Sequence, residues 1–183
     1  MNDRLDLREL LARSAVVSLP AGRPLPWVMH KPLDYLTKLM SDLTMHRFDQ
    51  GEAAVHFAEK QVRSTDRAVG TYLAGAIVRK FGSSSGRNAF ARFDDSVPGN
   101  GLFAFSIEGV NGVVAGGSQD GAAKGSSGGS LIVLKGRNLL GRLVDGSTGK
   151  SFAYGAIGGL FFVQNMADSR ACIRMSGAEV VFG

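Results

Sequence analysis

The sequence lacks several features that would point to particular classes of protein. It has one cysteine in 183 residues, Cys172, so it cannot form an internal disulfide, and a reducing cytoplasm is the default setting. No apolar run approaches the roughly 20 residues that cross a bilayer. The short apolar stretch at residues 15–19 follows Arg13, which argues against a secretory signal. We therefore expect a cytoplasmic protein with no membrane partner.

Charge is sparse and evenly spread. The formal net charge is +5 and the pI is about 9.7, yet neither half of the chain holds a dense basic stripe or aromatics interleaved with arginines. Phosphate-backbone binding requires such a patch, so we expect no nucleic-acid partner. The 44% share of hydrophobic residues and the mean hydropathy of +0.04 predict a globular protein.

Patterns typical of catalytic and metal sites are missing as well. His30, His46 and His56 are not spaced with carboxylates or with Cys172 as metal ligands are, so we expect no metal site. Cys172 lies in the strand-like run ACIRM, which favours a buried structural thiol. The adjacent carboxylates at 94 and 95 favour a turn. No set of acid, base and nucleophile converges, and we expect no catalytic residue in this chain.

The Gly-Lys-Ser triplet at residues 149–151 raises the question of a phosphate-binding loop. Such a loop needs a glycine five positions before Gly149, where this chain has Val144, and a helix after it, where this chain has strand-like glycines and aromatics. The run GNGLFA at residues 99–104 fails the same test of context. We expect these glycines to shape turns, and we expect no cofactor in this chain.

Glycine is abundant and unevenly placed, with five of the 25 in residues 1–82 and the other 20 in residues 83–183. The first part predicts helices at residues 3–16 and, after a proline-rich break, from Pro32 onwards. The second helix has apolar residues at spacings of three and four: Leu33, Leu36, Met40 and Leu43. Residues 54–62 are ambiguous between strand and helix.

A lead-in helix is predicted over residues 66–81. Its expected N-cap is Ser64, Thr65 or Asp66, and its expected C-terminal glycine is Gly82. The expected apolar stripe is Val69, Leu73, Ala76 and Ile77, with Arg79 and Lys80 in the last turn. Gly70 and Gly75 suggest that another segment packs closely against it.

The glycine-rich part is an imperfect repeat with a period of about 19 residues. Gly109 to Gly128 is 19 residues, Gly128 to Gly158 is 30, and Gly159 to Gly177 is 18, so a dozen residues around GRNLLGRLVDG form an insertion. Such repetition is typical of a solenoid. We expect a right-handed parallel β-helix of about four coils. Its inward ladder would be Val114, Val133, Val163 and Val181.

The chain resembles the C-terminal GXGXG-type domain of the glutamate synthase large subunit over residues 56–183. The matching positions are Thr65-Asp66-Arg67 with Val69-Gly70, Leu73, Gly75 and Gly82, then Lys124-Gly125 with Gly128-Gly129, Tyr154-Gly155-Ala156 with Gly158-Gly159, and Ser176-Gly177-Ala178. Of the stretch rich in Asp and Asn that precedes Lys124 in the family, only Asp120 is retained. Residues 1–50 carry no match, and residues 1–55 are expected to form a helical arm.

The resemblance implies a non-catalytic assembly domain of a glutamate-synthase-type complex, preceded by the lead-in helix. It implies glutaminase and FMN-binding synthase partners, with FMN and an iron–sulfur cluster only in those partners. Thr65, Asp66 and Arg67 are the candidate docking contacts, although the local pattern at Asp66-Arg67 favours helix capping and a salt bridge. The expected structural turns are Gly109, Gly125, Gly128, Gly129, Gly155, Gly158, Gly159 and Gly177.

The resemblance also implies further coils after Gly183 in the family. We therefore expect the C-terminal end of the solenoid to be covered by another copy or by a different subunit. A second hypothesis is a β-helix scaffold in another oxidoreductase complex, such as one of the formylmethanofuran dehydrogenase type.

Overall fold

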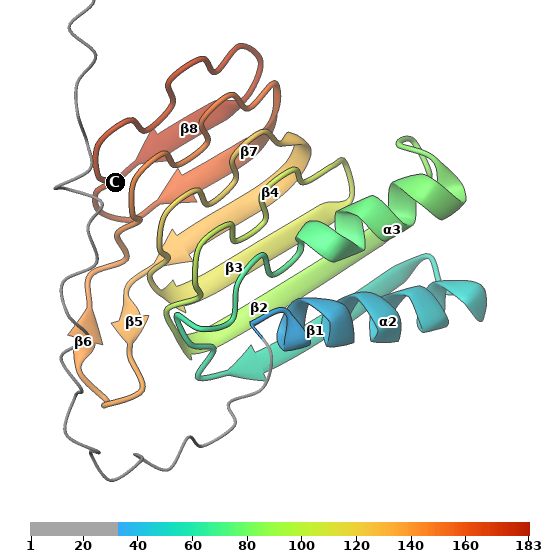
Figure 1. The fold of residues 1–183 in the computed structure, drawn as a ribbon, viewed down its shortest axis with the longest axis horizontal. Helices are drawn as coiled ribbons and strands as arrows, with labels where there is room; N and C mark the ends of the chain where they lie inside the picture. The colour runs from blue at the N-terminus through green and yellow to red at the C-terminus, as the bar shows by residue number, and fades with distance from the viewer. Residues whose placement is uncertain (1–32) are drawn as a thin grey trace, which may run out of the picture. The chain divides into compact units, whose positions relative to one another are not determined.

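The computed structural model describes residues 33–183, which include two helices, six parallel strands and a small hairpin (Figure 1). The elements are α2 (Tyr35–Asp49), β1 (Ala54–Lys60), α3 (Thr71–Phe81), β2 (Asn88–Ser96), β3 (Val110–Gly116), β4 (Ser127–Leu134), β5 (Gly136–Arg137), β6 (Leu143–Val144), β7 (Gly158–Val163) and β8 (Glu179–Phe182). The predicted helix at residues 3–16, the proline-rich break and His30 lie outside the described residues.

The six long strands form one sheet in the order β1-β2-β3-β4-β7-β8, and every neighbouring pair is parallel. The register confirms the period read from the sequence, because Gly112 pairs with Leu131, Leu131 with Phe161, and Phe161 with Val180. The 11 extra residues between β4 and β7 include the antiparallel hairpin β5-β6, which is the predicted insertion.

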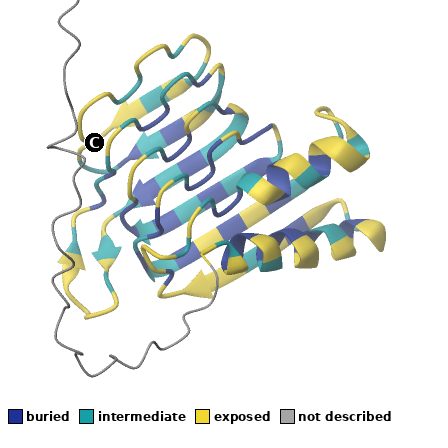
Figure 2. Cartoon of the chain, in the orientation of Figure 1, coloured by how far each residue is buried: buried dark blue, intermediate teal, exposed yellow. Residues whose placement is uncertain are grey.

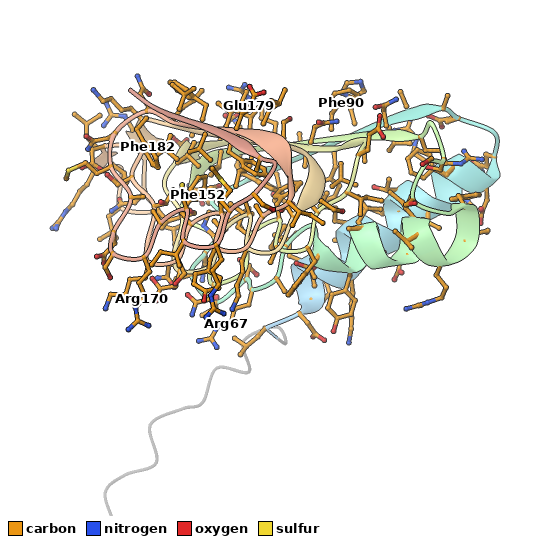
Figure 3. All side chains as sticks on the ribbon, turned by 90° about the horizontal axis from the view of Figure 1, so that it is seen from above. Arg67, Phe90, Phe152, Arg170, Glu179 and Phe182 are labelled. Atoms are coloured by element: carbon orange, nitrogen blue, oxygen red, sulfur yellow. The ribbon has the colours of Figure 1, made fainter. Side chains whose placement is uncertain are left out.

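One face of the sheet carries the second layer of the fold. Figure 1 shows α2 and α3 over the β1 side of the sheet, with a series of turns continuing on the same face towards β8. In Figure 3 the sheet forms one side of the molecule, and the helices and turns form the other. Phe152, on one of these turns, lies between the two layers, where it meets Phe161 edge-on at 6.1 Å between ring centroids.

The core is a set of columns that run across the strands. Phe93, Val114, Val133 and Val163 pair in succession, and all four side chains are fully buried. The expected valine ladder is thus confirmed at three positions and wrong at the fourth, since Phe182 pairs with Val163 while Val181 points outwards. Figure 2 shows the burial fading at β8, none of whose residues is buried.

The expectation of a parallel β-helix is wrong. Each repeat contributes one strand to one sheet, and the rest of each repeat folds as turns. Outside the named strands of residues 33–183, parallel pairing is limited to isolated bridges that join Thr148 to Ser118 and to Ala167. With two helices packed on a parallel sheet, the arrangement is of the α/β kind. Glycine and small residues permit strands and turns alike, so the repeat alone did not show which segments extend.

Helix α2 forms where predicted, but its buried face is partly polar. Leu36 and Met40 are buried as expected, whereas Leu33 and Leu43 are exposed. The buried face is completed by Thr37, Ser41, Thr44 and Phe48. The Thr37 hydroxyl donates to the carbonyl of Ala68 at 2.5 Å, which ties α2 to the segment before α3.

Helix α3 begins five residues later than predicted, at Thr71, with Gly70 as its N-cap in the left-handed region (φ 88°). A β-carbon at Gly70 would lie 3.0 Å from the Phe103 ring, so close packing there requires glycine. A β-carbon at Gly75 would meet nothing within 4 Å, so the close packing expected at this position is not found among the described residues. Ala74, and not Ala76, completes the buried stripe of Val69, Leu73 and Ile77. The helix ends at Gly82, as expected.

Arg87 joins the C-terminal ends of the two helices. Its guanidinium donates to the carbonyls of Phe48 and Glu52, at 3.1 and 2.9 Å, and lies 4.0 Å above the Phe81 ring. The turn expected at the paired aspartates is wrong: both lie in β2, where Asp95 has a φ of 51° and the register with β3 shifts.

Residues 33–183 belong to one compact unit, which includes α2 and the first two residues of β1 from the expected arm. In residues 33–183, no helix is both long and apolar enough to cross a membrane.

Candidate docking surfaces

The turns on the second layer are stacked and hydrogen-bonded to one another. In the turn at 100–106, Gly101 and Phe105 donate their N–H groups to the carbonyls of Asp120 and Lys124 in the next turn, at 2.9 and 2.7 Å. The pattern repeats twice along the stack. The donors are Gly121 and Gly125, then Ser151 and Gly155, and the acceptors are Lys150 and Tyr154, then Ser169 and Ile173. Each turn therefore holds its successor through the same two backbone groups.

The last turn of the stack, at 169–175, has these two donors free. Arg170 and Arg174 occupy the positions of Ser151 and Gly155, and neither N–H has a partner within residues 33–183. Strand β8 lies at the same edge and pairs only with β7 among the described strands. Unpaired strand edges are sites at which another chain can add.

Apolar side chains accompany these free donors. Ile173 and Phe182 are each 44% exposed, and Val181 is 57% exposed. We call the free edge of β8 together with Arg170, Ile173, Arg174, Val181 and Phe182 the end surface. The sequence analysis expected this end to be open, but of these residues it named only Val181, which it placed in the inward ladder. The 19-residue period could have found them, since it places Arg170 and Arg174 one repeat after Ser151 and Gly155.

The eight glycines expected at turns lie where strands begin or turns bend. Five have a positive φ, which only glycine adopts without strain: Gly109, Gly125, Gly129, Gly155 and Gly159. The other three lie close against the backbone of the preceding repeat. A β-carbon at Gly128 would come within 2.5 Å of the Glu108 nitrogen, one at Gly158 would meet the Ser127 carbonyl, and one at Gly177 would meet that of Ile157.

The three expected docking residues lie in the loop before α3. The Asp66 carboxylate accepts from the Arg63 N–H at 2.8 Å, and the Asp66 carbonyl accepts from the Gly99 N–H at 3.0 Å. Thr65 and Arg67 are exposed, and Figure 3 shows Arg67 on the side away from the sheet, as it does Arg170. Asp66 thus orders a loop that presents the side chains of Thr65 and Arg67. The N-cap of α3 is Gly70, and not one of the residues expected there.

Cys172 lies inside the last turn, in line with Ala153 and Ala123 of the two turns before it. The sequence analysis expected it to be buried, and it is half-buried. Burial raises the pKa of the Cys172 thiol above its ordinary value. A raised thiol pKa opposes nucleophilic chemistry, because the thiolate is the reactive form.

The described residues offer little chemistry elsewhere. A pocket of about 200 Å³ lies between the serine-rich loop at 83–88 and Glu108, but the Arg87 guanidinium beside it is already bonded to the carbonyls of Phe48 in α2 and of Glu52 before β1. Within residues 33–183, no three His, Cys, Asp or Glu side chains gather where they could hold a metal ion.

Comparison with known families decides the relationship. The family model described as the GXGXG motif matches residues 37–183. This chain belongs to the GXGXG family. The resemblance drawn from the sequence is thereby confirmed, and the match begins in α2, within the expected arm.

The relatives of this GXGXG domain are glutamate synthases. It is 30% identical to the ferredoxin-dependent glutamate synthase of Spinacia oleracea over 179 residues, which is 97% of this chain and 11% of the relative. It is 28% identical to ferredoxin-dependent glutamate synthase 2 of Synechocystis over 160 residues, 85% of this chain and 10% of the relative. It is 33% identical to the NADPH glutamate synthase large chain of Azospirillum brasilense over 121 residues, 65% of this chain and 8% of the relative. The chain thus spans about a tenth of the length of these relatives.

Proposed function

We propose that this GXGXG domain is a non-catalytic assembly domain of a glutamate-synthase-type complex, which transfers the amide nitrogen of glutamine. The observation that carries the proposal is the family match over residues 37–183, together with the similarity to about a tenth of the length of glutamate synthases. A stacked fold with few titratable groups brought together suits a spacer between catalytic units better than a reaction centre.

The proposed partners are glutaminase and FMN-binding synthase subunits. FMN and the iron–sulfur cluster would be carried by those subunits and not by this chain. Two surfaces are proposed for docking. The first is the exposed pair Thr65 and Arg67, oriented by Asp66. The second is the end surface, whose free N–H groups at Arg170 and Arg174 would receive carbonyl groups of a partner or of another copy. We place this complex in the cytoplasm.

The test is co-expression of the tagged 183-residue chain with the glutaminase and FMN-binding synthase proteins of the same genome. The expected result is a stable co-eluting complex with flavin absorbance, while the chain purified alone shows none. Recovery of neither protein with the tagged chain would overturn the proposal. Recovery of a different oxidoreductase would favour the scaffold hypothesis instead.

Two variants distinguish the docking surfaces. Arg67→Glu changes an exposed charge without touching the backbone of the loop, and Ile173→Glu places a carboxylate beside the free donors of the last turn. We expect each to lower recovery of at least one partner. Arg79→Glu, an exposed change on α3, is the matched control and should leave recovery unchanged.

A further inference from the structure

The sheet has a second face that the described residues leave bare. We call it the outer face, and Figure 3 shows Phe90 and Glu179 pointing from it, away from the helices and turns. Parallel sheets are almost always covered on both faces. Here the outer face carries Phe90, Leu160 and Val181, which are 41%, 60% and 57% exposed. An exposed apolar patch on a parallel sheet indicates an interaction surface.

The strand register arranges the outer face in two rows that cross the sheet from β1 to β8. The first row is His56, Phe90, Asn111, Ser130, Leu160 and Glu179. The second row is Ala58, Arg92, Val113, Ile132, Phe162 and Val181. In the first row the polar and charged members lie at matching distances from the centre of the sheet, between β3 and β4, and in the second row the central pair is apolar.

We propose that two copies of this chain pack outer face to outer face, about a twofold axis that runs along the strands between β3 and β4. This axis places β1 over the partner's β8, β2 over its β7 and β3 over its β4. It does not depend on the proposed function, since a single purified protein would form it. Sheets that pack face to face keep their strands within about 30° of each other, which this axis allows.

The first row is self-complementary under this rotation. His56 faces the partner's Glu179, so an imidazole that can donate meets a carboxylate. Phe90 faces the partner's Leu160, and both are apolar. Asn111 faces the partner's Ser130, and within one chain these two side chains already hydrogen-bond at 2.9 Å. The polar pair at the centre therefore has donors and acceptors to share across the interface.

The second row matches equally well. Val113 faces the partner's Ile132 at the centre, where burial is deepest. Arg92 faces the ring of the partner's Phe162, a favourable cation–π arrangement, and its charge is already balanced by Asp94 at 3.0 Å. A twofold axis across the strands would instead press Glu179 against the partner's Val181. Burying an unpaired carboxylate against an apolar side chain is unfavourable, so the axis along the strands is preferred.

The area suits a dimer of modest affinity. Six strands about 4.8 Å apart, in contact over about 17 Å of their length, give roughly 500 Å² of projected face per copy. Stable interfaces bury about 800 Å² of accessible surface per partner. Side chains protrude from the sheet, so its accessible area exceeds the projected area, and this face lies at the low end of the interface sizes of stable complexes. We expect a dissociation constant in the micromolar range, on the order of 10 µM.

The first experiment is sedimentation equilibrium of the full chain from about 1 to about 200 µM, a range that brackets the expected constant. The wild type should pass from monomer to dimer. Ile132→Lys places a charge at the centre of the interface and should raise the dissociation constant at least about 30-fold. Val78→Lys, at a 41% exposed apolar site on α3, is the matched control and should leave it unchanged. Circular dichroism checks that both variants fold.

The second experiment tests contact between His56 and Glu179. Within one chain these residues lie on the two outermost strands, about 24 Å apart by strand spacing, so they touch only across two copies. Glu179→Lys should weaken the dimer about 5-fold to 10-fold, and adding His56→Asp to the same chain should restore most of the loss.

Each outcome decides the proposal. A wild type that stays monomeric throughout overturns it, as does a dimer that survives Ile132→Lys. A dimer broken by Ile173→Glu but not by Ile132→Lys would place the contact at the end surface instead and also overturn it. Failure of the co-expression test would leave these readings intact, because they require only the purified chain.

Discussion

The two ends of the sheet are built differently, although they share one register. The β1–β3 side is covered by α2 and α3 and fills its core with large side chains, among them Met40, Phe48, Leu73, Ile77 and Phe93. The β4–β8 side is covered by turns, whose interior positions hold Ala122, Ala123, Ala153 and Ala156, with Phe152 as the one fully buried aromatic of the turns at 120–126, 150–156 and 169–175.

The comparison teaches where each end gains its stability. The helical end depends on apolar side chains, and it closes the stack there. The turn end depends on close backbone approach and on hydrogen bonds between repeats, and it leaves donors free at its last turn. The outcomes below should separate these two contributions.

The largest expected effect is the removal of a buried aromatic ring. Phe93→Ala, in the middle of the sheet, should lower the free energy of unfolding by about 4 kcal/mol, because the cavity cannot collapse. Phe152→Ala should cost less, about 3 kcal/mol, since its neighbour Phe182 is 44% exposed and can move into the space. Urea denaturation of both variants measures the difference. Equal losses would contradict the view that the β8 side can relax.

A smaller loss is expected where repeats touch through backbone. Gly128→Ala would bring a β-carbon within 2.5 Å of the Glu108 nitrogen, and backbone cannot give way as a side chain can. We expect a loss of about 2 kcal/mol in the free energy of unfolding. Gly141→Ala is a useful comparison: a β-carbon there would meet nothing within 4 Å, although the φ of 69° adds its own strain. A Gly128 variant as stable as wild type would show that the repeats are not in close contact.

At Gly75, on the helical end, a substitution is expected to raise the free energy of unfolding. This glycine lies inside α3, is exposed and has open space around it. Gly75→Ala should therefore raise the free energy of unfolding by about 0.5–1 kcal/mol through helix propensity alone. The same denaturation series measures it, and a loss of stability would show an unseen contact at this site.

The smallest effect concerns the thiol in the last turn. Because burial raises the pKa of Cys172, its alkylation by iodoacetamide should require higher pH in the folded protein than in urea. The raised pKa also makes stability depend on pH. The contribution of the neutral Cys172 thiol to the free energy of unfolding is fully present below the ordinary thiol pKa and is lost as pH rises through the pKa of the folded state. Cys172→Ala should abolish the labelling. Equal rates in both states would show that the last turn is open.

The sequence predicted the parts of this fold that depend on a regular spacing of residues. The insertion, the 19-residue register and the end of α3 at Gly82 follow from positions of glycine and β-branched residues. The start of α3 was missed because Asp66 satisfies its own loop and a left-handed Gly70 begins the helix. The turn layer was taken for further strands because its glycine and small residues are compatible with strands and turns alike.

The candidate site was predictable only in outline. The sequence pointed to an open end, but the free N–H groups at Arg170 and Arg174 depend on backbone pairing that no side-chain pattern reports. The outer face was missed because its rows become visible only when five strand registers are combined. The local sequence shows the length of the repeat, whereas the contacts between neighbouring repeats can be seen only in the assembled sheet.

The alternation of left-handed residues along the turns has a consequence for how the chain acquires its shape. Phe103, Ala123, Ala153 and Cys172 all have φ between 48° and 58°, a conformation that residues with a β-carbon avoid when alone. Each is held there by a hydrogen bond to the segment before it. Each turn can therefore hold its left-handed residue only after the preceding turn has formed. We expect folding to proceed in one direction, one repeat after another, away from the two helices.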